Sequence, residues 1–299
     1  MKVTKPERKI ETGVFDRHTL LVISKFLKKR VIESLDYPIS TGKEADVFHA
    51  TTLDGRNLAV KIFRIETSTF RAMEDYLVSD PRFKGISDNK FDIINAWTRK
   101  EFKNLQIMEE AGVHSPHPLI CHANVLIMEF LGVGGMAYST LFQAGSLAPE
   151  SDARSILDDI ARMYRAGLVH ADISEYNIMM TDKGPYIIDA GQGVLIKHPK
   201  AHEFLRRDID NIVRYFRKYS LGLDTETEYQ KIISEEIEHG KLRRRKKKFQ
   251  REPETPAGDG TGGGADDEEG EGDIVGAGEI EGADAGAGRD DAPENVDGE

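Results

Sequence analysis

The hydrophobic pattern in the first half of the chain predicts β-strands. Residues 39–60 alternate between apolar and polar side chains, and an Asp54-Gly55 turn separates the runs 47–52 and 57–63. Such a turn between two alternating runs is typical of a β-hairpin. A continuous apolar run over 124–130 predicts a further, buried strand.

Helical spacing dominates the second half. Apolar residues recur every three to four positions in a segment from Ser151, ended by Gly167, and again over 201–219, which predicts two amphipathic helices. Two short strands, 178–181 and 186–189, are expected between them. A strand-rich half followed by a helical half favours an α+β fold with two lobes.

Two helices and one loop are also expected in the first half. The same spacing predicts helices over 16–35 and over 96–111, the second ended by Gly112. Residues 79–95 are polar and rich in Asp, Lys, Asn and Gly, which predicts a mobile loop.

The stretch LVHADISEYNIMM, between the second-half helix and the following strand, contains three candidate catalytic residues. His170, Asp172 and Asn177 match the catalytic loop of protein kinases, in which the Asp receives the substrate proton and the Asn binds a metal ion. Asp189, in YIIDAGQ, follows the next strand and can bind magnesium as the Asp of D-F-G does. Either motif alone is also compatible with a capped turn or a surface loop, but their order favours catalysis.

Lys61, in LAVKIF, lies in the middle of a predicted strand, like the kinase lysine that contacts the nucleotide phosphates. The alternative is an outward, solvated lysine. Its expected partner is Glu101, with Glu109 and Glu110 as exposed competitors near the helix end. The preceding segment STGKEADV has one glycine and matches neither G-x-G-x-x-G nor a Walker loop, although Ser40, Thr41 and Gly42 offer donors for phosphate oxygens.

Seven segments together resemble the successive signature segments of the RIO1 family of atypical serine/threonine protein kinases, in a form like that of archaea. The resemblance runs from about Val14 to Tyr219 and is carried by DYPISTGKEADVF, AVKIF, WTRKEFKNL, VLIMEF, LVHADISEYNIMM, IIDAGQ and HPKAHEFLRRDIDNI. It implies a bilobal, protein-kinase-like RIO fold. A RIO2 assignment is less favoured, because that family carries a winged-helix domain before the kinase core and only 39 residues precede Ser40.

The resemblance also implies a role for each matching residue. Asp172 would be the catalytic aspartate, and Lys61 would contact phosphates and pair with Glu101. Asn177 and Asp189 would hold magnesium, or manganese in its place. The ATP site would be lined by Ser40, Thr41, Gly42, Lys43, Glu44, Met128, Glu129 and Leu131, with the backbone of the last two against adenine.

Several further features follow from the same resemblance. The loop at 79–95 would fold over the nucleotide and carry an autophosphorylation site, for which Ser87 is the candidate. The family acts in maturation of the small ribosomal subunit and has been viewed as an ATPase-like switch that phosphorylates its own catalytic aspartate.

No A-P-E motif follows Asp189, and His198-Pro199 leads directly into the last helix. A long activation segment is therefore not expected, and general peptide phosphorylation is disfavoured. Asp208 is expected to brace the catalytic loop or His170, or else to be a surface carboxylate.

Charge is unevenly distributed. The net charge is −11, but residues 251–299 hold 17 acidic residues against 2 Arg, which leaves +4 for residues 1–250. The tail also has 13 of the 28 glycines and is expected to be disordered, either as a solvated extension or as an arm that competes with nucleic acid. The run KLRRRKKKF is read as a contact for ribosomal RNA, or else as a solvated helix extension; its cations are Lys241, Arg243, Arg244, Arg245, Lys246, Lys247 and Lys248.

The remaining composition sets broad limits. The single Cys121 excludes an internal disulfide and a cysteine-based zinc cluster and is expected to be a buried thiol. No run is apolar enough to span a bilayer, and the first residues lack the apolar centre of a signal peptide, so a cytoplasmic protein is expected. The expected regions are an extension over 1–38, an N-lobe over 39–131, a C-lobe over 132–222, a basic extension over 223–250 and the tail.

Two other functions remain open at this point. The ATP pocket could report conformation in a ribosome-assembly factor with little turnover. A small-molecule phosphotransferase would share the Asp-Asn spacing but typically not STGKEA or SEYN. The intact Asp172, Asn177 and Asp189 favour an enzyme.

Overall fold

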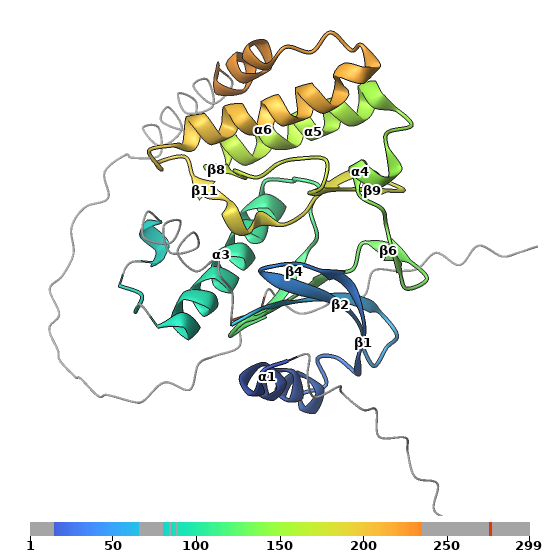
Figure 1. Ribbon diagram of the computed structural model, residues 1–299, viewed down its shortest axis with the longest axis vertical. Coiled ribbons are helices and arrows are strands. Elements are labelled where there is room, and N and C mark those ends of the chain that lie inside the picture. The colour runs from blue at the N-terminus through green and yellow to red at the C-terminus, as the bar shows by residue number, and fades with distance from the viewer. Residues whose placement is uncertain (1–14, 66–79, 84, 88, 235–274, 277–299) are drawn as a thin grey trace, which may run out of the picture.

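The computed structural model describes residues 15–65, 80–83, 85–87, 89–234 and, for the backbone alone, 275–276. They form two lobes, with an antiparallel sheet at one end and a group of helices at the other (Figure 1). The expected α+β, bilobal fold is therefore present.

The N-lobe contains one sheet with the strand order β1-β2-β3-β5-β4-β12. The predicted hairpin is β2 and β3, whose register pairs Val47 with Lys61 and Thr51 with Asn57. The strands are β1 (Ser34–Thr41), β2 (Ala45–Thr51), β3 (Asn57–Phe63), β4 (Pro118–His122), β5 (Val125–Glu129) and β12 (Val275–Gly276).

Alternation in β3 sends its side chains to two different environments. Val60 and Ile62 pack in one cluster with Phe26 of helix α1 (Arg17–Lys28), so α1 covers that face of the sheet. Ala59 and Lys61 point the other way and line the cavity between the lobes. Period-two alternation is thus what turns Lys61 toward the cavity.

Helix α1 is shorter than the expected 16–35. It ends at Lys28, and Arg30 adopts a left-handed backbone with φ 57°, which breaks the helical path. Val31 and Ile32 still pack with the same cluster, so their apolar character reflects burial and not helix.

Helix α3 (Lys90–Glu110) is longer than the expected 96–111. Its cap is Asn89, whose side chain accepts a hydrogen bond from the Phe91 N–H. Residues 90–95 are therefore helical and not part of a loop. Before them, a short helical turn, η1 (Pro81–Phe83), is described, while 66–79, 84 and 88 lie outside the described residues.

The C-lobe is built on two long helices, α5 and α6, that lie side by side (Figure 1). α5 begins at Pro149, two residues before the expected start, because Pro fills the first helical position and Ser151 is not the cap. Residues 225–234 are also helical. The elements are β6 (Gly132–Val133), β7 (Met136–Ala137), α4 (Leu141–Ala144), α5 (Pro149–Arg165), β8 (Leu168–Val169), β9 (Ile178–Thr181), β10 (Gly184–Ile187), η2 (Ala190–Gln192), β11 (Val194–Leu195), α6 (Ala201–Phe216) and η3 (Arg217–Tyr219).

The connection from Asp189 to α6 is short. Residues 190–200 contain only η2 and β11 before α6 begins at Ala201. The expected lack of a long activation segment is therefore confirmed.

The core joins α3 to the C-lobe. One cluster contains Phe102 and Leu105 of α3, Ile156 of α5 and Ile209 of α6. Cys121 is buried, as expected, and burial raises the pKa of its thiol to about 12. Among the described residues, no helix has the length and apolar character needed to cross a membrane. The region boundaries at 39, 132 and 223 stay predictions, although β1 begins at Ser34.

Candidate active site

A cavity of about 740 Å³ lies between the two lobes. Strands β1, β2, β3 and β5 form its N-lobe wall, and the loops around Asp172 and Asp189 form its C-lobe wall. Of the residues expected at the ATP and catalytic site, only Thr41, the last residue of β1, is absent from the lining. Those in the lining are Ser40, Gly42, Lys43, Glu44, Lys61, Glu101, Met128, Glu129, Leu131, Asp172, Asn177 and Asp189.

Lys61 joins the two walls of the cavity. Its Nζ lies 2.8 Å from both carboxylate oxygens of Glu101 on α3 and 2.8 Å from Oδ1 of Asp189. The lysine is only 7% exposed and Glu101 only 1%. The expected Lys61–Glu101 ion pair is therefore present, and the alternative of an outward lysine is wrong. Glu109 and Glu110 are exposed near the end of α3.

The charges of this group are interdependent. Burial alone would lower the pKa of Lys61, but Asp189 and Glu101 raise it above its ordinary value, so the lysine stays cationic. Burial raises the pKa of Glu101 to about 7, against the opposing effect of Lys61. At Asp189, burial is outweighed by the charge and hydrogen bond of Lys61, which lower the pKa of the carboxyl. Asp189 thus remains an anion beside the cavity.

Asp172 and Asn177 face the same cavity from the loop between β8 and β9. Asn177 Nδ2 donates to the Asp172 carbonyl at 2.8 Å and to its Oδ2 at 3.0 Å. These bonds fix the orientation of the amide, so its oxygen remains available to a cation. Burial and then the nearby Asp189 raise the pKa of the Asp172 carboxyl, which suits a group that must accept a proton.

Asp208 braces this loop from α6. Its carboxylate accepts hydrogen bonds from the Ala171 N–H at 2.8 Å and the Ile173 N–H at 3.0 Å. It is 1% exposed, so the surface-carboxylate alternative is wrong. His170 bonds instead through Nε2 to the Ile188 carbonyl at 3.2 Å, and burial lowers its pKa to about 4. A neutral His170 therefore supports the segment that leads to Asp189.

Two residues of the site have left-handed backbones without being glycine. Ala171, just before Asp172, has φ 65°, and Asp189 has φ 62°. Such conformations are uncommon for residues with a Cβ and persist where surrounding contacts impose them. The chain therefore changes direction just before Asp172 and at Asp189, beside the strands β8 and β10.

The turn between β1 and β2 contributes one edge of the cavity. The Gly42 N–H bonds to the Ala45 carbonyl at 3.0 Å, and a Cβ on Gly42 would lie 3.0 Å from that same oxygen. A small residue is therefore needed for the tight turn. Glu44 lines the same cavity, and burial, followed by the charge of Asp189, raises the pKa of its carboxyl.

Glu129 and Leu131 line the cavity between the lobes. The Glu129 N–H already bonds to the His117 carbonyl at 2.8 Å, and the Leu131 carbonyl accepts from the Tyr138 N–H at 3.0 Å. These two backbone groups are therefore already paired within the protein. Met128 also lines this end.

Several lining residues were not expected from the sequence. Ile39, Val47, Ala59, Met179 and Ile188 supply apolar surface to the cavity. Ala59 and Val47 alternate with core residues on their strands, so strand periodicity could have identified them. Lys100 and Asn104 of α3, which are four positions apart and so share a helix face, were also not assigned.

The oxygen donors fit a magnesium ion. Two carboxylates, Asp172 and Asp189, and the amide oxygen of Asn177 face one cavity, and Mg²⁺ prefers such ligands together with nucleotide phosphates. Among the described residues, no group of three or more His, Cys, Asp or Glu is arranged to hold a metal without other ligands.

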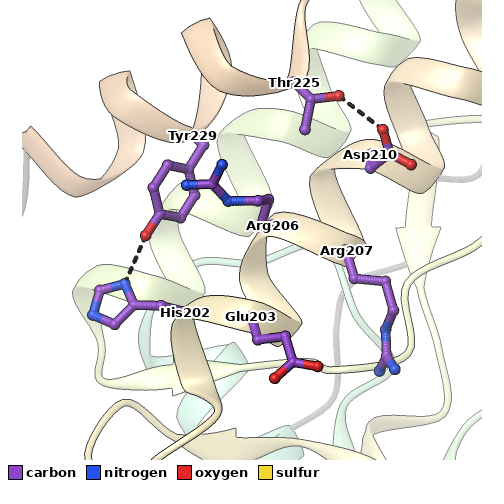
Figure 2. Close-up of a pocket in the computed structure, with 7 residues that line it drawn as sticks. All are labelled: His202, Glu203, Arg206, Arg207, Asp210, Thr225 and Tyr229. Carbon is purple, nitrogen blue, oxygen red and sulfur yellow. Dashed lines mark hydrogen bonds between the residues drawn. The ribbon is translucent and has the colours of Figure 1, made fainter.

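A second cavity, of about 590 Å³, lies beside α6 (Figure 2). Its polar groups are largely paired with one another or with neighbouring residues. His202 Nδ1 lies 2.9 Å from the Tyr229 hydroxyl, Thr225 donates to Asp210 at 3.0 Å, and Arg206 lies over the Tyr229 ring. These contacts dock the helix at 225–234 onto α6.

One expected site lies away from the cavity, and another falls outside the described residues. Ser87 is exposed, its hydroxyl accepts from the Asn89 N–H at 3.2 Å, and it is not among the residues that line the cavity. Phosphorylation of Ser87 stays a prediction. The basic run from Lys241 to Lys248 lies outside the described residues.

Comparisons with known proteins agree with this geometry. A model of the RIO domain matches residues 46–231. The RIO-type serine/threonine-protein kinase Rio1 of Haloferax volcanii is 42% identical over 232 residues, 78% of this chain and 80% of the relative. Human serine/threonine-protein kinase RIO1 is 34% identical over 238 residues, 77% of this chain and 42% of the relative.

A solved structure supports the fold. The Rio2 kinase from Chaetomium thermophilum, described as an ADP/Mg²⁺-phosphoaspartate complex, superimposes with a TM-score of 0.54. It is 21% identical and covers 71% of this chain and 65% of its own. At that identity the likeness establishes the arrangement of the two lobes.

Proposed function

This chain belongs to the RIO1 family of serine/threonine-protein kinases, and on that basis we propose that it uses magnesium ATP to phosphorylate serine residues, including its own, with slow ATP hydrolysis. The observation that carries the proposal is the group of Lys61, Glu101 and Asp189, which faces Asp172 and Asn177 across one cavity. Transfer of a phosphoryl group needs these charges more than it needs covalent chemistry.

Each residue of the group has one task. Lys61, held by Glu101, neutralises charge on the nucleotide phosphates, and the turn at 40–44 contacts them through backbone and side-chain donors. Asp172 orients the acceptor hydroxyl and takes its proton, helped by the raised pKa of its carboxyl. Asn177 and Asp189 would hold magnesium, which neutralises the phosphate oxygens when bound; manganese offers a similar charge and oxygen preference.

The test is incubation with gamma-labelled ATP and magnesium. We compare the wild type with Asp172→Asn, Asp189→Asn and the control Asp158→Asn, which changes an exposed carboxylate on α5. We expect label on the protein or in free phosphate for the wild type and the control, and its loss in both cavity variants. Label that resists hydroxylamine marks a phosphoserine, and label that hydroxylamine removes marks a phosphoaspartate.

The alternative is an assembly factor that binds ATP with little turnover. Nucleotide binding without label transfer in any form would support it and would contradict the kinase proposal. The intact Asp172, Asn177 and Asp189 favour turnover.

We further propose that the protein acts in the cytoplasm on a precursor of the small ribosomal subunit. Support comes from the family resemblance and from the positive charge of residues 241–248. Seven of these eight residues are Lys or Arg. Binding through such a run depends on charge, so affinity for small-subunit RNA should fall steeply with salt. A variant with these seven residues changed to Gln should bind weakly and with a smaller salt slope; an unchanged slope would contradict this contact.

A further inference from the structure

Helix α3 holds the backbone turn that follows Asp189 through two buried polar side chains. Lys100, which is 0% exposed, donates from Nζ to the Gly191 carbonyl at 2.6 Å and to the Gly193 carbonyl at 2.7 Å. One turn further along the helix, Asn104 donates from Nδ2 to the Ala190 carbonyl at 2.8 Å and to Gly193 at 3.1 Å. Two side chains thus engage three carbonyls of one short turn.

The turn also packs directly against the helix. A Cβ on Gly191 would lie 3.2 Å from Trp97 Nε1, and a Cβ on Gly193 would lie 2.8 Å from Asn104 Nδ2. Side chains at these two positions would push the turn away from α3. Glycine therefore allows the carbonyls to come within reach of Lys100 and Asn104.

Burying the ammonium group of Lys100 is unfavourable in itself. An ammonium group loses its hydration when it is buried, and burial lowers the pKa of Lys100 to about 7. A Met of similar length would fill the same space without that cost, but it would leave the carbonyls of the turn without these donors. The lysine adds these hydrogen bonds to the turn, and its ammonium group also lies 4.9 Å from the centre of the Trp97 ring.

The position of the turn fixes that of Asp189. Asp189 immediately precedes the turn, and its left-handed backbone leaves it dependent on its neighbours for orientation. Its carboxylate contacts Lys61, whose other partner is Glu101, the residue next to Lys100. Helix α3 therefore holds Asp189 from two sides, at the carboxylate through Glu101 and Lys61 and at the backbone through the turn.

Asn104 is itself held by the segment before α3. Its Oδ1 accepts from Arg82 Nη2 at 2.9 Å, and Arg82 forms an ion pair with the buried Asp80. The acceptor bond to Arg82 sets which way the amide points, so that Nδ2 faces the turn. Residues 80–82 thus support the contact between Asn104 and the turn.

We propose that Lys100 and Asn104 are positioning residues that place Asp189 to bind the magnesium ion shared with the nucleotide. The inference rests on the proposed role of Asp189 as a magnesium ligand. Lys100 and Asn104 do not touch the nucleotide cavity, and they act through the backbone of residues 190–193. Residues that orient metal ligands typically change metal affinity by about 10- to 100-fold when they are replaced.

The test separates magnesium binding from nucleotide binding. Lys100→Met removes the ammonium donors, and Asn104→Asp keeps the shape and the acceptor for Arg82 but removes the donor to the turn. Lys103→Met is the matched control, because Lys103 lies on the same helix but is exposed. ADP affinity is measured by calorimetry in EDTA and across a magnesium titration, and amide hydrogen exchange is followed over 188–194.

We expect both variants to bind ADP in EDTA within about twofold of the wild-type affinity. The magnesium concentration at which ADP affinity rises should be about tenfold higher in both variants. Amides of 190–193 should exchange faster in both, without nucleotide present. A wild-type magnesium dependence, or an equal loss with and without magnesium, would overturn the proposal. Asp189→Asn is measured alongside: if it retains the wild-type magnesium dependence, the assigned role of Asp189 fails, which is a different result from failure of the positioning role.

Discussion

Lys61 and Glu101 depend on each other for stability as well as for the proposed catalysis. Both side chains are buried, and loss of one partner leaves a charge without compensation, which costs about 3 kcal/mol or more. We expect Lys61→Met to unfold at lower urea concentration and to lose phosphoryl transfer. The double variant Lys61→Met/Glu101→Leu should recover most of the stability but none of the transfer. If the single variant is as stable as the double variant, the ion pair does not carry the stability assigned to it.

The raised pKa of Asp208 leads to a prediction of how the free energy of unfolding changes with pH. Burial raises the pKa of its carboxyl to about 7 from an ordinary value of 3.8, although the Ile173 and Ala171 N–H groups oppose this shift. Because the folded-state pKa is raised, the stability linked to the bound proton is fully present below about pH 4 and is lost as pH rises toward 7. The free energy of unfolding of the wild type, relative to that of Asp208→Asn, should therefore fall between pH 5 and pH 7.5. Urea titrations at the two pH values measure it, and parallel changes in both proteins would contradict this pKa.

At the residue scale, the sequence predicted the cavity residues that kinase spacing defines. Lys61, Asp172, Asn177 and Asp189 stand at fixed places relative to strands and turns, so the order of motifs was enough to bring them together. Lys100 was missed because a lysine on a helix is usually solvated. Its burial depends on a turn some 90 residues later in the chain, as the contacts to Gly191 and Gly193 show.

At the scale of elements, the first turn of α3 depends on its cap. Asn89 accepts from the Phe91 N–H at 3.1 Å, which satisfies one of the free donors at the helix start. Asn89→Ala should lower the free energy of unfolding by about 1 kcal/mol, and Asn89→Asp should preserve it. Chemical denaturation measures both variants. Equal losses in the two would show that the side-chain oxygen is not what caps the helix.

The same helix shows why element boundaries were harder to predict than element types. Residues 90–95 contain Asp and Asn beside Lys and resemble a loop in composition, but Ile93 and Ile94 are buried against Phe63 and Trp97. Helix α1 was instead predicted too long, because Val31 and Ile32 continue the apolar pattern after the chain has changed direction at Arg30. In both cases tertiary packing decided where the helix begins or ends.

At the scale of the molecule, α3 contacts both lobes, and both lobes line the cavity between them. α3 belongs to the core of the C-lobe through Phe102 and Leu105, yet it contacts the sheet through Glu101 and Lys61. A ligand in the cavity contacts both walls at once. Binding should therefore stabilise both lobes together, because a ligand that binds only the folded protein shifts the unfolding equilibrium by mass action.

This coupling gives a prediction for thermal unfolding with nucleotide. ADP with magnesium at 100 times its Kd should add about 2.7 kcal/mol, a rise of about 5–10 °C for a domain of this size. Ala59→Leu, which places a larger side chain in the cavity wall beside Met128, should abolish most of the rise. Thr41→Val should retain it, because Thr41 is exposed and does not line the cavity. Differential scanning fluorimetry measures all three proteins. If Thr41→Val loses the rise while Ala59→Leu keeps it, the nucleotide binds over the β1–β2 turn and outside the cavity between the lobes.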